Sequence, residues 1–396
     1  MEYKLASSTW DSLEIDAIQR VIKSEIFSMH TEVQTYEKMF SEFVKSKYAV
    51  MVSSGSTANL LMIGSLFFTK DKNKRLKRGD EVIVPAVSWS TTYFPLQQYG
   101  LKVKFVDIDR DTLNFDLEKL EKAISDKTRA ILAVNILGNP NNFQTIQNFI
   151  NDKNIILLED NCESLGAKFE GKSTGTFGIM GTYSSFYSHH IATMEGGCIT
   201  TDDEELYHIL LTLRAHGWTR NLPKKNHVVE KYDDDFHEAF RFVLPGYNVR
   251  PVEMSGAIGI EQLKKLPGFI ENRRANAKRL QDLFHDLSFI QLQKEIGESS
   301  WFGFSIVLRE DSPFSRDDLI SKFKEKNIEC RPIVTGNFLN NKEVLKYFDY
   351  EASGNFDNAE YIDNKGLFVG NHHTDISEEI LYLHRSISEL IAKTNT

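Results

Sequence analysis

Short apolar runs rich in β-branched residues alternate, through the first two-thirds of the chain, with longer stretches whose apolar positions recur at helical spacing. The short runs have the length and composition of buried strands, and the longer stretches predict amphipathic helices. The predicted strands cover residues 48–52, 81–84, 102–106, 130–134 and 155–158, and the predicted helices cover residues 56–66, 116–124 and 143–151. This alternation predicts right-handed crossovers and a mostly parallel sheet with helices on both faces.

A long polar stretch at residues 216–247 interrupts the alternation. A loop of that length inside a compact domain usually has a function. Beyond it, the pattern predicts helices at residues 251–266, 269–287, 314–326 and 377–391, with a strand at residues 302–308. We therefore expect two domains, a large one over residues 1–265 and a smaller C-terminal α+β domain over residues 266–396.

The composition is that of an ordinary globular protein and narrows the class of partner. Of the 396 residues, 41% are hydrophobic and 26% are charged. The 47 basic and 56 acidic residues leave a net charge of −9, which disfavours nucleic acid as a partner. No apolar stretch reaches the length needed to cross a bilayer, and the first residues lack the profile of a signal peptide. We expect a cytoplasmic protein that binds neither nucleic acid nor a membrane.

The three cysteines, Cys162, Cys198 and Cys330, are widely separated and form no CxxC pair. They cannot build a disulfide framework, and they are too few for an iron–sulfur cluster ligated by four thiolates. The adjacent pair His189 and His190 has no Asp, Glu or Cys around it at metal-ligand spacing. We therefore expect neither a metal ion nor an iron–sulfur cluster.

Three polar segments follow predicted strands, at the sheet edge where ligands of such folds collect. Residues 53–59 (Ser-Ser-Gly-Ser-Thr-Ala-Asn) offer hydroxyls and free backbone N–H groups at a helix start, which suit either a phosphate or a plain N-cap. Trp89 comes just after the second strand, where its ring can stack on a ligand or complete a core. Asp160 closes an apolar run, where a carboxylate needs a partner, although a helix-capping role is equally open.

Four separated segments resemble the motifs of one family, the DegT/DnrJ/EryC1/StrS sugar aminotransferases. Residues 183–197 (Tyr-Ser-Ser-Phe-Tyr-Ser-His-His-Ile-Ala-Thr-Met-Glu-Gly-Gly) are similar to the segment that carries the cofactor lysine of that family. A serine lies five residues before that lysine and Glu-Gly-Gly starts six after it, which puts His189 in its place. The other segments are residues 53–59, 159–167 (Glu-Asp-Asn-Cys-Glu-Ser-Leu-Gly-Ala) and 245–251 (Pro-Gly-Tyr-Asn-Val-Arg-Pro). The resemblance implies the aminotransferase fold of type I, with pyridoxal 5'-phosphate (PLP) as cofactor.

The resemblance also implies which residues hold the phosphate of that cofactor. Ser56, Thr57 and Ser184 match hydroxyl residues that bind it, and Gly55 lets the backbone approach closely. Asn248 matches the asparagine of a Gly-Tyr-Asn-x-Arg motif, which reaches the phosphate in the neighbouring subunit. The protein is therefore expected to form a homodimer with shared active sites.

Further residues are expected around the cofactor ring and the substrate. Trp89 takes the place of the side chain that lies flat against the pyridine ring, and Asp160 that of the carboxylate paired with the protonated pyridine nitrogen. Glu163 stands where most family aminotransferases have glutamine, and we expect it at the phenolic oxygen. The candidate substrate-binding residues are His216, Arg250 and Arg331. Arg331 is suited to a carboxylate of an amino donor, whereas His216 is equally consistent with a solvent-facing loop position.

Histidine in place of lysine changes the expected reaction. A lysine amine can form a Schiff base with the cofactor, whereas an imidazole only moves protons. Histidine at this position marks the sugar 3-dehydratases of the family. The resemblance thus implies removal of the C3 hydroxyl from a nucleotide-linked 4-keto-6-deoxy sugar, with GDP as the nucleotide. L-Glutamate would regenerate the pyridoxamine form of the cofactor (PMP), with ammonia released. His189, with an ordinary pKa of about 6.5, would move the C4′ proton.

Such an enzyme would serve the synthesis of dideoxysugars for a surface polysaccharide such as a lipopolysaccharide O-antigen. One histidine-type branch of the family also needs an iron–sulfur cluster, which three scattered cysteines do not support. Two alternatives stay open: a sugar aminotransferase whose lysine comes from elsewhere, such as Lys224 or Lys225, and a non-catalytic regulator on the same fold. The presence of both Asp160 and Ser184 argues against the regulator.

Overall fold

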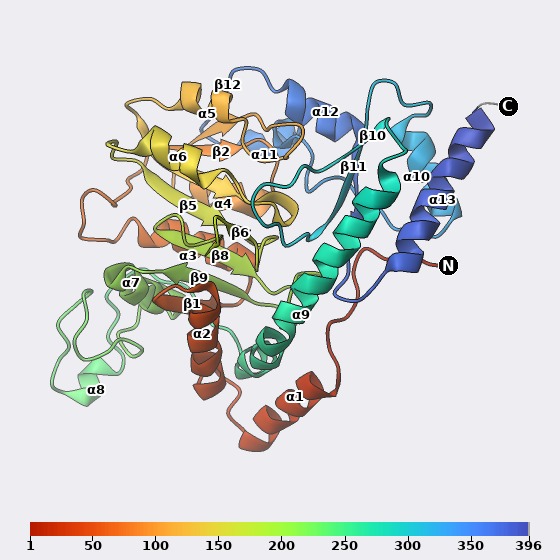
Figure 1. The fold of residues 1–396 in the computed structure, drawn as a ribbon. Coiled ribbons are helices and arrows are strands. Elements are labelled where there is room, and N and C mark those ends of the chain that lie inside the picture. Colours follow the sequence, from red (N-terminus) through yellow and green to blue (C-terminus); the bar gives the residue numbers. More distant parts are fainter. Residues whose placement is uncertain (395–396) are drawn as a thin grey trace.

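The computed structural model describes residues 1–394, and its centre is an eight-stranded sheet (Figure 1). The strands lie in the order β1-β9-β8-β5-β4-β2-β3-β12. β9 pairs antiparallel with both of its neighbours, and the other pairs in the sheet are parallel. Their bounds are β1 Tyr48–Val52, β2 Glu81–Pro85, β3 Lys102–Val106, β4 Thr128–Val134, β5 Ile156–Asp160, β8 Met180–Ser184, β9 Gly197–Thr201 and β12 Tyr350–Ser353. The mostly parallel sheet that the sequence predicts is confirmed.

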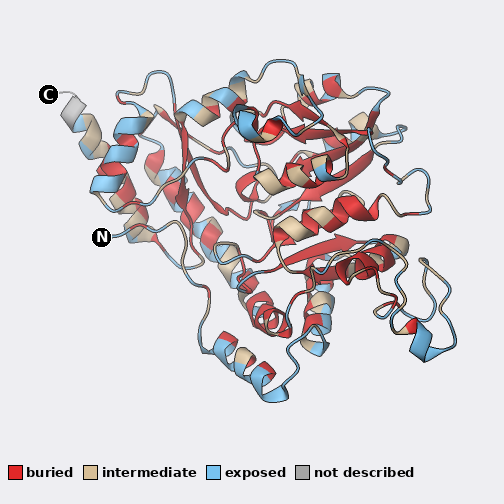
Figure 2. Ribbon diagram, turned by 180° about the vertical axis from the view of Figure 1, so that it is seen from behind, coloured by how far each residue is buried: buried red, intermediate tan, exposed pale blue. Residues whose placement is uncertain are grey.

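Helices cover both faces of this sheet because its strands are apolar on both sides. Val50 of β1 packs in one cluster with Leu61 of α3, whereas Met51 packs with Phe40 of α2 on the opposite face. The first face is covered by α3 (Gly55–Ser65), α4 (Ser90–Gln98) and α7 (Glu204–Arg214), and the second by α2 (Thr31–Val44), α5 (Leu117–Ala123) and α6 (Phe143–Ile150). Figure 2 shows the strands as a buried layer among these helices.

A second, smaller sheet lies in the C-terminal part, as the sequence predicts. Its antiparallel strands are β10 (Ile290–Leu292), β11 (Gly303–Leu308) and β13 (Gly366–Gly370). The helices that share its core are α9 (Glu253–Phe284), α10 (Arg316–Glu325) and α13 (Ser377–Thr394). Tyr3 joins this core and donates a hydrogen bond from its hydroxyl to the carbonyl of Gly370 at 2.8 Å. The N-terminal residues are thereby bound to the C-terminal part.

The remaining elements are short or lie at the edges. They are α1 Ser12–Ser24, α8 Asp235–Glu238, α11 Lys342–Leu345, α12 Asp357–Lys365, the 3-10 turns Ile136–Gly138 and Phe338–Asn340, and the paired strands β6 Lys168–Phe169 and β7 Lys172–Ser173. The polar stretch at residues 216–247 contains α8 and is otherwise irregular, and it projects from the body of the protein beyond α7 (Figure 1). Among residues 1–394, no helix is both long and apolar enough to cross a membrane.

One expectation is wrong: residues 251–287 contain a single long helix and not two. α9 continues from Glu253 to Phe284 with Pro267 inside it. A proline lacks the N–H donor of the helical bond and crowds the preceding turn, which costs roughly 3 kcal/mol. The packing of both halves outweighs that cost, because Leu263 lies in the core beside α2 and Leu280 in the core of the small sheet. Tertiary contacts therefore decide the length of this helix.

The division into two domains after residue 265 stays a proposal, and two features connect the parts that it separates. α9 runs through the boundary. β12 returns from the C-terminal part and pairs in parallel with β3 at the edge of the large sheet. Leu339 and Leu345 accompany it into the core of that sheet.

Candidate active site

A cavity of about 520 Å³ lies where β1, β2, β4, β5 and β8 end. Parallel strands bring their carboxyl ends to one edge of a sheet, so the segments that follow them meet there. The opposite wall comes from the C-terminal part, with Phe302 and Phe368, and from the N-terminal residues Leu5 and Ala6. Of the twelve residues that the sequence points to, the structure brings eight to this cavity: Gly55, Ser56, Trp89, Asp160, Glu163, Ser184, His189 and Arg331.

The carboxylate of Asp160 is held in place by hydrogen bonds from the protein itself. Oδ2 accepts from Asn59 Nδ2 and Thr92 Oγ1, each at 2.8 Å, and Oδ1 accepts from the backbone N–H of Cys162 at 3.1 Å. Asn59 is oriented in turn by the Thr182 hydroxyl, which donates to its Oδ1 at 2.6 Å. Sequence reasoning missed Asn59 and Thr92 as supports. The signal was available, since each is a polar residue in the first turns of a helix that follows a strand.

The start of α3 forms a narrow polar pocket beside Ser184. A Cβ atom on Gly55 would lie 2.7 Å from Cβ of Ser184 and 2.9 Å from Sγ of Cys162, so only glycine fits there. The Ser56 hydroxyl pairs with that of Thr91 at 2.8 Å. The hydroxyl of Thr57 is used differently from the expectation, because it donates to the carbonyl of Ser54 at 2.9 Å within the N-cap of the helix. Unpaired N–H groups at such a helix start attract a phosphate.

His189 and His190 point in different directions, although the chain turns and bends here and is not extended. His189 lines the cavity, with its ring centre 5.1 Å from that of Phe302. His190 instead places Nε2 3.1 Å from the carbonyl oxygen of Ser300. The Nδ1 atom of His189 is buried and has no hydrogen-bond partner among the described residues. His189 is therefore the member of the pair that can act on a bound molecule.

The surroundings of His189 move its pKa away from the ordinary histidine value. Burial, assisted by the positive charges of Arg331 and Arg273, lowers the pKa of His189 from 6.5 to about 3. A buried imidazolium loses its hydration, and neighbouring cations disfavour it further. The imidazole is therefore neutral at physiological pH, with a nitrogen lone pair free to accept a proton.

Glu163 and Arg331 face each other across the cavity. Nη2 of Arg331 lies 3.9 Å from Oε1 of Glu163, and the guanidinium lies 4.6 Å from the ring centre of Phe368. Glu163 also accepts a hydrogen bond from the backbone N–H of Leu137 at 3.1 Å. Burial raises the pKa of Glu163, and the charge of Arg331 opposes that rise.

Trp89 is 52% exposed and lines the same cavity, so it is not an ordinary core tryptophan.

The predicted residues His216, Asn248 and Arg250 lie together in a cluster outside this cavity. Nε of Arg250 donates to Oδ1 of Asn248 at 3.0 Å, and its Nη2 lies 3.4 Å from Nε2 of His216. The backbone joins them too, through a β-bridge between Ala215 and Asn248. The cluster has the cationic and donor groups of an anion site, but these groups do not line the cavity of their own chain.

The cavity fits a flat, protonated heteroaromatic ring that carries a phosphate. Asp160 offers an oriented carboxylate for the ring nitrogen, Trp89 offers an aromatic face, and the pocket at Gly55 offers backbone N–H groups for the phosphate. PLP has these features. Over the described range 1–394, no three His, Cys, Asp or Glu side chains are grouped as metal ligands.

Comparison with known proteins agrees with this geometry. The chain is 66% identical to the GDP-4-keto-6-deoxy-D-mannose 3-dehydratase of Yersinia pseudotuberculosis over 381 residues, 96% of each protein. Its structure superimposes on an Escherichia coli enzyme of the same name with bound hydrated PLP, with a TM-score of 0.96, 65% identity and coverage of 98% and 99%. A structure of GDP-4-keto-6-deoxymannose-3-dehydratase with a trapped PLP–glutamate geminal diamine matches with a TM-score of 0.96, 64% identity and coverage of 98% and 100%.

The likeness in fold confirms the aminotransferase-type α/β architecture expected from the four motifs. A family model for DegT/DnrJ/EryC1/StrS aminotransferases matches residues 9–386, which is nearly the whole chain. The chain therefore belongs to the DegT/DnrJ/EryC1/StrS aminotransferase family.

Proposed function

We propose that this protein is a PLP-dependent 3-dehydratase that removes the C3 hydroxyl of GDP-4-keto-6-deoxy-D-mannose and uses L-glutamate as its amino donor. The observation that carries the proposal is the neutral His189 on the cavity wall, where the family has its lysine. None of the described residues that line the cavity is a lysine. Relatives that share about two-thirds of the sequence bear this activity in their names.

A sugar aminotransferase would need a lysine in this cavity, and no lysine is among the described residues that line it. The side chain of Lys224 is 91% exposed and lies 3.8 Å from Asp233, on the loop that projects from the body. Lys225 is an exposed residue of the same loop. Neither lines the cavity. The proposed product is therefore a 3-deoxy-4-keto sugar with free ammonia, and not an amino sugar.

The residues of the cavity divide the work of holding the cofactor. When bound, PLP supplies an electron sink, and its amine form supplies the nitrogen that condenses with the C4 ketone. Asp160 holds a proton at the pyridine nitrogen, and Trp89 keeps the ring in one orientation. Gly55, Ser56 and Ser184 bind the phosphate through N–H and hydroxyl groups. Together these residues would hold the cofactor in the cavity that His189 also lines.

With the cofactor bound, His189 would deliver a proton to C4′ when glutamate donates its amine, and would remove a proton from C4′ when the C3 hydroxyl leaves the sugar as water. A neutral imidazole can accept and release a proton in every turnover. It cannot form a Schiff base with the cofactor, so it cannot release the cofactor from the sugar and leave the nitrogen behind. Arg331 binds a carboxylate of glutamate through its planar guanidinium. Arg331 lines the same cavity, with Nη2 3.9 Å from Oε1 of Glu163, which supports this role.

An experiment that follows the nitrogen of glutamate into the products tests the proposed function directly. The protein is mixed with nitrogen-labelled L-glutamate, PLP and GDP-4-keto-6-deoxy-D-mannose, and the products are analysed by mass spectrometry. We expect labelled ammonia and an unlabelled 3-deoxy sugar, because no cavity lysine reclaims the cofactor. Labelled nitrogen retained in the sugar would make the protein an aminotransferase and contradict the proposal.

We further propose that the enzyme is a homodimer in which the cluster of His216, Asn248 and Arg250 completes the cavity of the partner subunit. The cluster suits a phosphate but lies outside the cavity of its own chain. Three aromatic side chains of the neighbouring loop are exposed: Phe236 at 81%, Phe240 at 66% and Phe242 at 56%. Several exposed aromatic side chains on one loop are typical of a protein interface.

Complementation between two inactive variants tests this arrangement. His189→Asn and Asn248→Ala proteins are co-expressed with different tags, and the mixed dimers are compared with each variant alone. If Asn248 serves the partner's cavity, each mixed dimer has one intact site, and a random mixture recovers about a quarter of wild-type activity. If Asn248 serves its own cavity, both sites of a mixed dimer are damaged and no activity returns.

A further inference from the structure

The loop that carries His189 is closed at its base by hydrogen bonds. The N–H of Ser185 donates to the carbonyl of Gly196, and the N–H of Thr193 donates to the carbonyl of Ser185, both at 2.9 Å. Between these residues the chain has no regular secondary structure. The position of the His189 side chain therefore depends on the further contacts that hold this loop.

Two side chains hold the loop at Ala192, three residues after His189 and next to Thr193 at the base. The N–H of Ala192 donates to Oε1 of Gln262 on α9 at 3.0 Å. The carbonyl of the same residue accepts from Nε1 of Trp10 at 2.8 Å. Ala192 is 2% exposed, so both of its backbone groups are withdrawn from water and need these partners.

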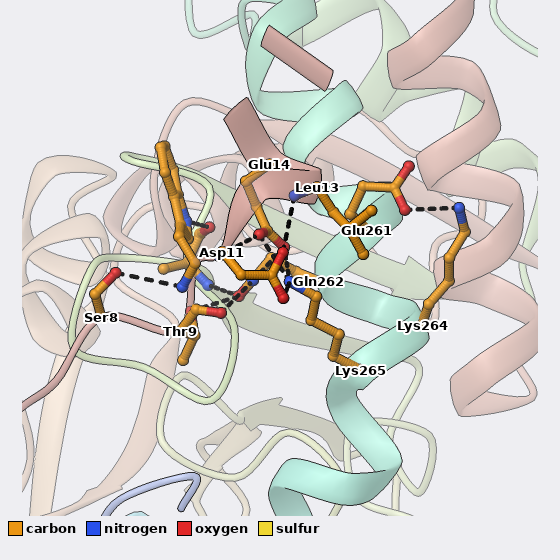
Figure 3. Close-up of polar contacts among 11 residues, drawn as sticks. Ser8, Thr9, Asp11, Leu13, Glu14, Glu261, Gln262, Lys264 and Lys265 are labelled. Carbon is orange, nitrogen blue, oxygen red and sulfur yellow. Dashed lines mark hydrogen bonds and ion pairs between the residues drawn. The ribbon is translucent and has the colours of Figure 1, made fainter. Parts of the chain in front are cut away.

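Gln262 has every one of its hydrogen-bonding positions occupied. Its Oε1 also accepts from the Thr9 hydroxyl at 2.6 Å, and its Nε2 donates to the carbonyl of Thr9 at 3.1 Å and to Oε1 of Glu14 at 2.8 Å. The orientation of the amide is determined, because the N–H of Ala192 can only donate and the carbonyl of Thr9 can only accept. Figure 3 shows Thr9, Glu14 and Gln262 meeting between the N-terminal segment and α9.

Glu14 ties this cluster to the start of α1. It is fully buried, and its two oxygens lie 2.8 and 2.7 Å from Nζ of Lys265. It also accepts from the backbone N–H of Asp11 at 2.8 Å, which completes a capping box. The neighbouring pair of Glu261 and Lys264 points away from the cluster (Figure 3). The supports of Ala192 are thus fixed by buried contacts of their own.

We propose that Trp10 and Gln262 are positioning residues that hold the loop at Ala192 and thereby keep the His189 imidazole at the C4′ atom of the cofactor. This inference rests on the proposed role of His189. Proton transfer needs its donor and acceptor within hydrogen-bond reach, and a displacement of about 1 Å can cost roughly a hundredfold in rate. The same N-terminal segment supplies Leu5 and Ala6 to the cavity wall.

Trp10→Phe is the first test, because it removes the Nε1–H donor and keeps an aromatic ring. We expect kcat for dehydration to fall about tenfold, while the KM for the sugar nucleotide and the affinity for PLP change less than about twofold. Backbone amides of residues 186–195 should exchange hydrogen faster in the protein without cofactor, as measured by mass spectrometry. Gln262→Met removes the second support, and we expect it to act in the same direction on both readouts.

Two control variants separate positioning from general stability. Asp11→Ala removes the cap of α1 and an ion pair with Lys265 but no contact of Ala192, so it should lower the melting temperature and leave kcat unchanged. Lys264→Met, on the same helix as Gln262, should change neither. Unchanged kcat or unchanged exchange in Trp10→Phe would overturn the inference, as would an equal loss of kcat in Asp11→Ala. A wild-type protein without dehydratase activity would instead refute the proposed function, and the positioning role with it.

Discussion

His189→Asn protein is expected to dehydrate its substrate roughly a thousandfold more slowly than wild type while it binds PLP with unchanged affinity. Asparagine occupies a similar space, but its amide cannot take up and return a proton near neutral pH. The groups that hold the phosphate and the ring nitrogen belong to other residues, Gly55, Asp160 and Ser184, so the cofactor keeps its contacts. Product formation is followed by mass spectrometry, and PLP binding by absorbance titration.

The pH dependence of the wild-type enzyme gives an independent check on His189. Because its pKa is lowered to about 3, the imidazole stays unprotonated as the pH falls through 6.5. We therefore expect kcat to remain level between about pH 6 and 8, without a fall around the ordinary histidine pKa.

Turnover by His189→Asn protein within about tenfold of wild type would contradict the role of His189 in proton transfer.

Asp160→Asn is expected to lower kcat by roughly a hundredfold to a thousandfold, because it removes the negative charge that keeps a proton on the pyridine nitrogen. Without that proton the ring withdraws electrons poorly, so both the glutamate and the sugar half-reactions should slow together. The chain should still fold, since an amide at this position can keep hydrogen bonds to Asn59 and Thr92. Single-turnover rates of each half-reaction, with thermal melting as a stability measure, check the result.

Thr92→Val is the matched control for Asp160→Asn. It removes one of the hydrogen bonds to the carboxylate and keeps the charge, so we expect a loss of about tenfold or less. If both variants lost activity equally, orientation and not charge would be the contribution of Asp160. If Asp160→Asn retained near wild-type rates in both half-reactions, the proposed pairing with the ring nitrogen would be wrong.

The strands of the large sheet show how far a local pattern can predict a fold. β1 and β3 have the bounds that the apolar runs predict, and β2, β4 and β5 differ by a few residues. Most of their positions are buried, so apolar and β-branched residues predominate in them, although β3 also carries Lys102 and Lys104. β8 and β9, with the sequences MGTYS and GCITT, carry small and polar residues and gave no comparable signal. Their place in the sheet follows from pairing with distant strands.

The site shows a similar division between motif and surroundings. The motifs pointed to Asp160 and His189, and both line the cavity. The pairing of these residues with their supports was not apparent, because Asn59 and Gln262 reach their partners across 101 and 70 positions of sequence. A buried glutamine in a helix has no pattern that distinguishes a support of the backbone from an ordinary polar residue.

By itself, the sequence determined the class of fold, the family motifs and the exchange of lysine for histidine, because these depend on residue identity and short-range periodicity. Only the tertiary structure decided that α9 continues through Pro267, that the pKa of His189 falls to about 3, and that Trp10 and Gln262 hold the loop at Ala192. Each of these depends on burial and on groups distant in the chain. Solvation and packing act through space, so a local sequence pattern does not contain them.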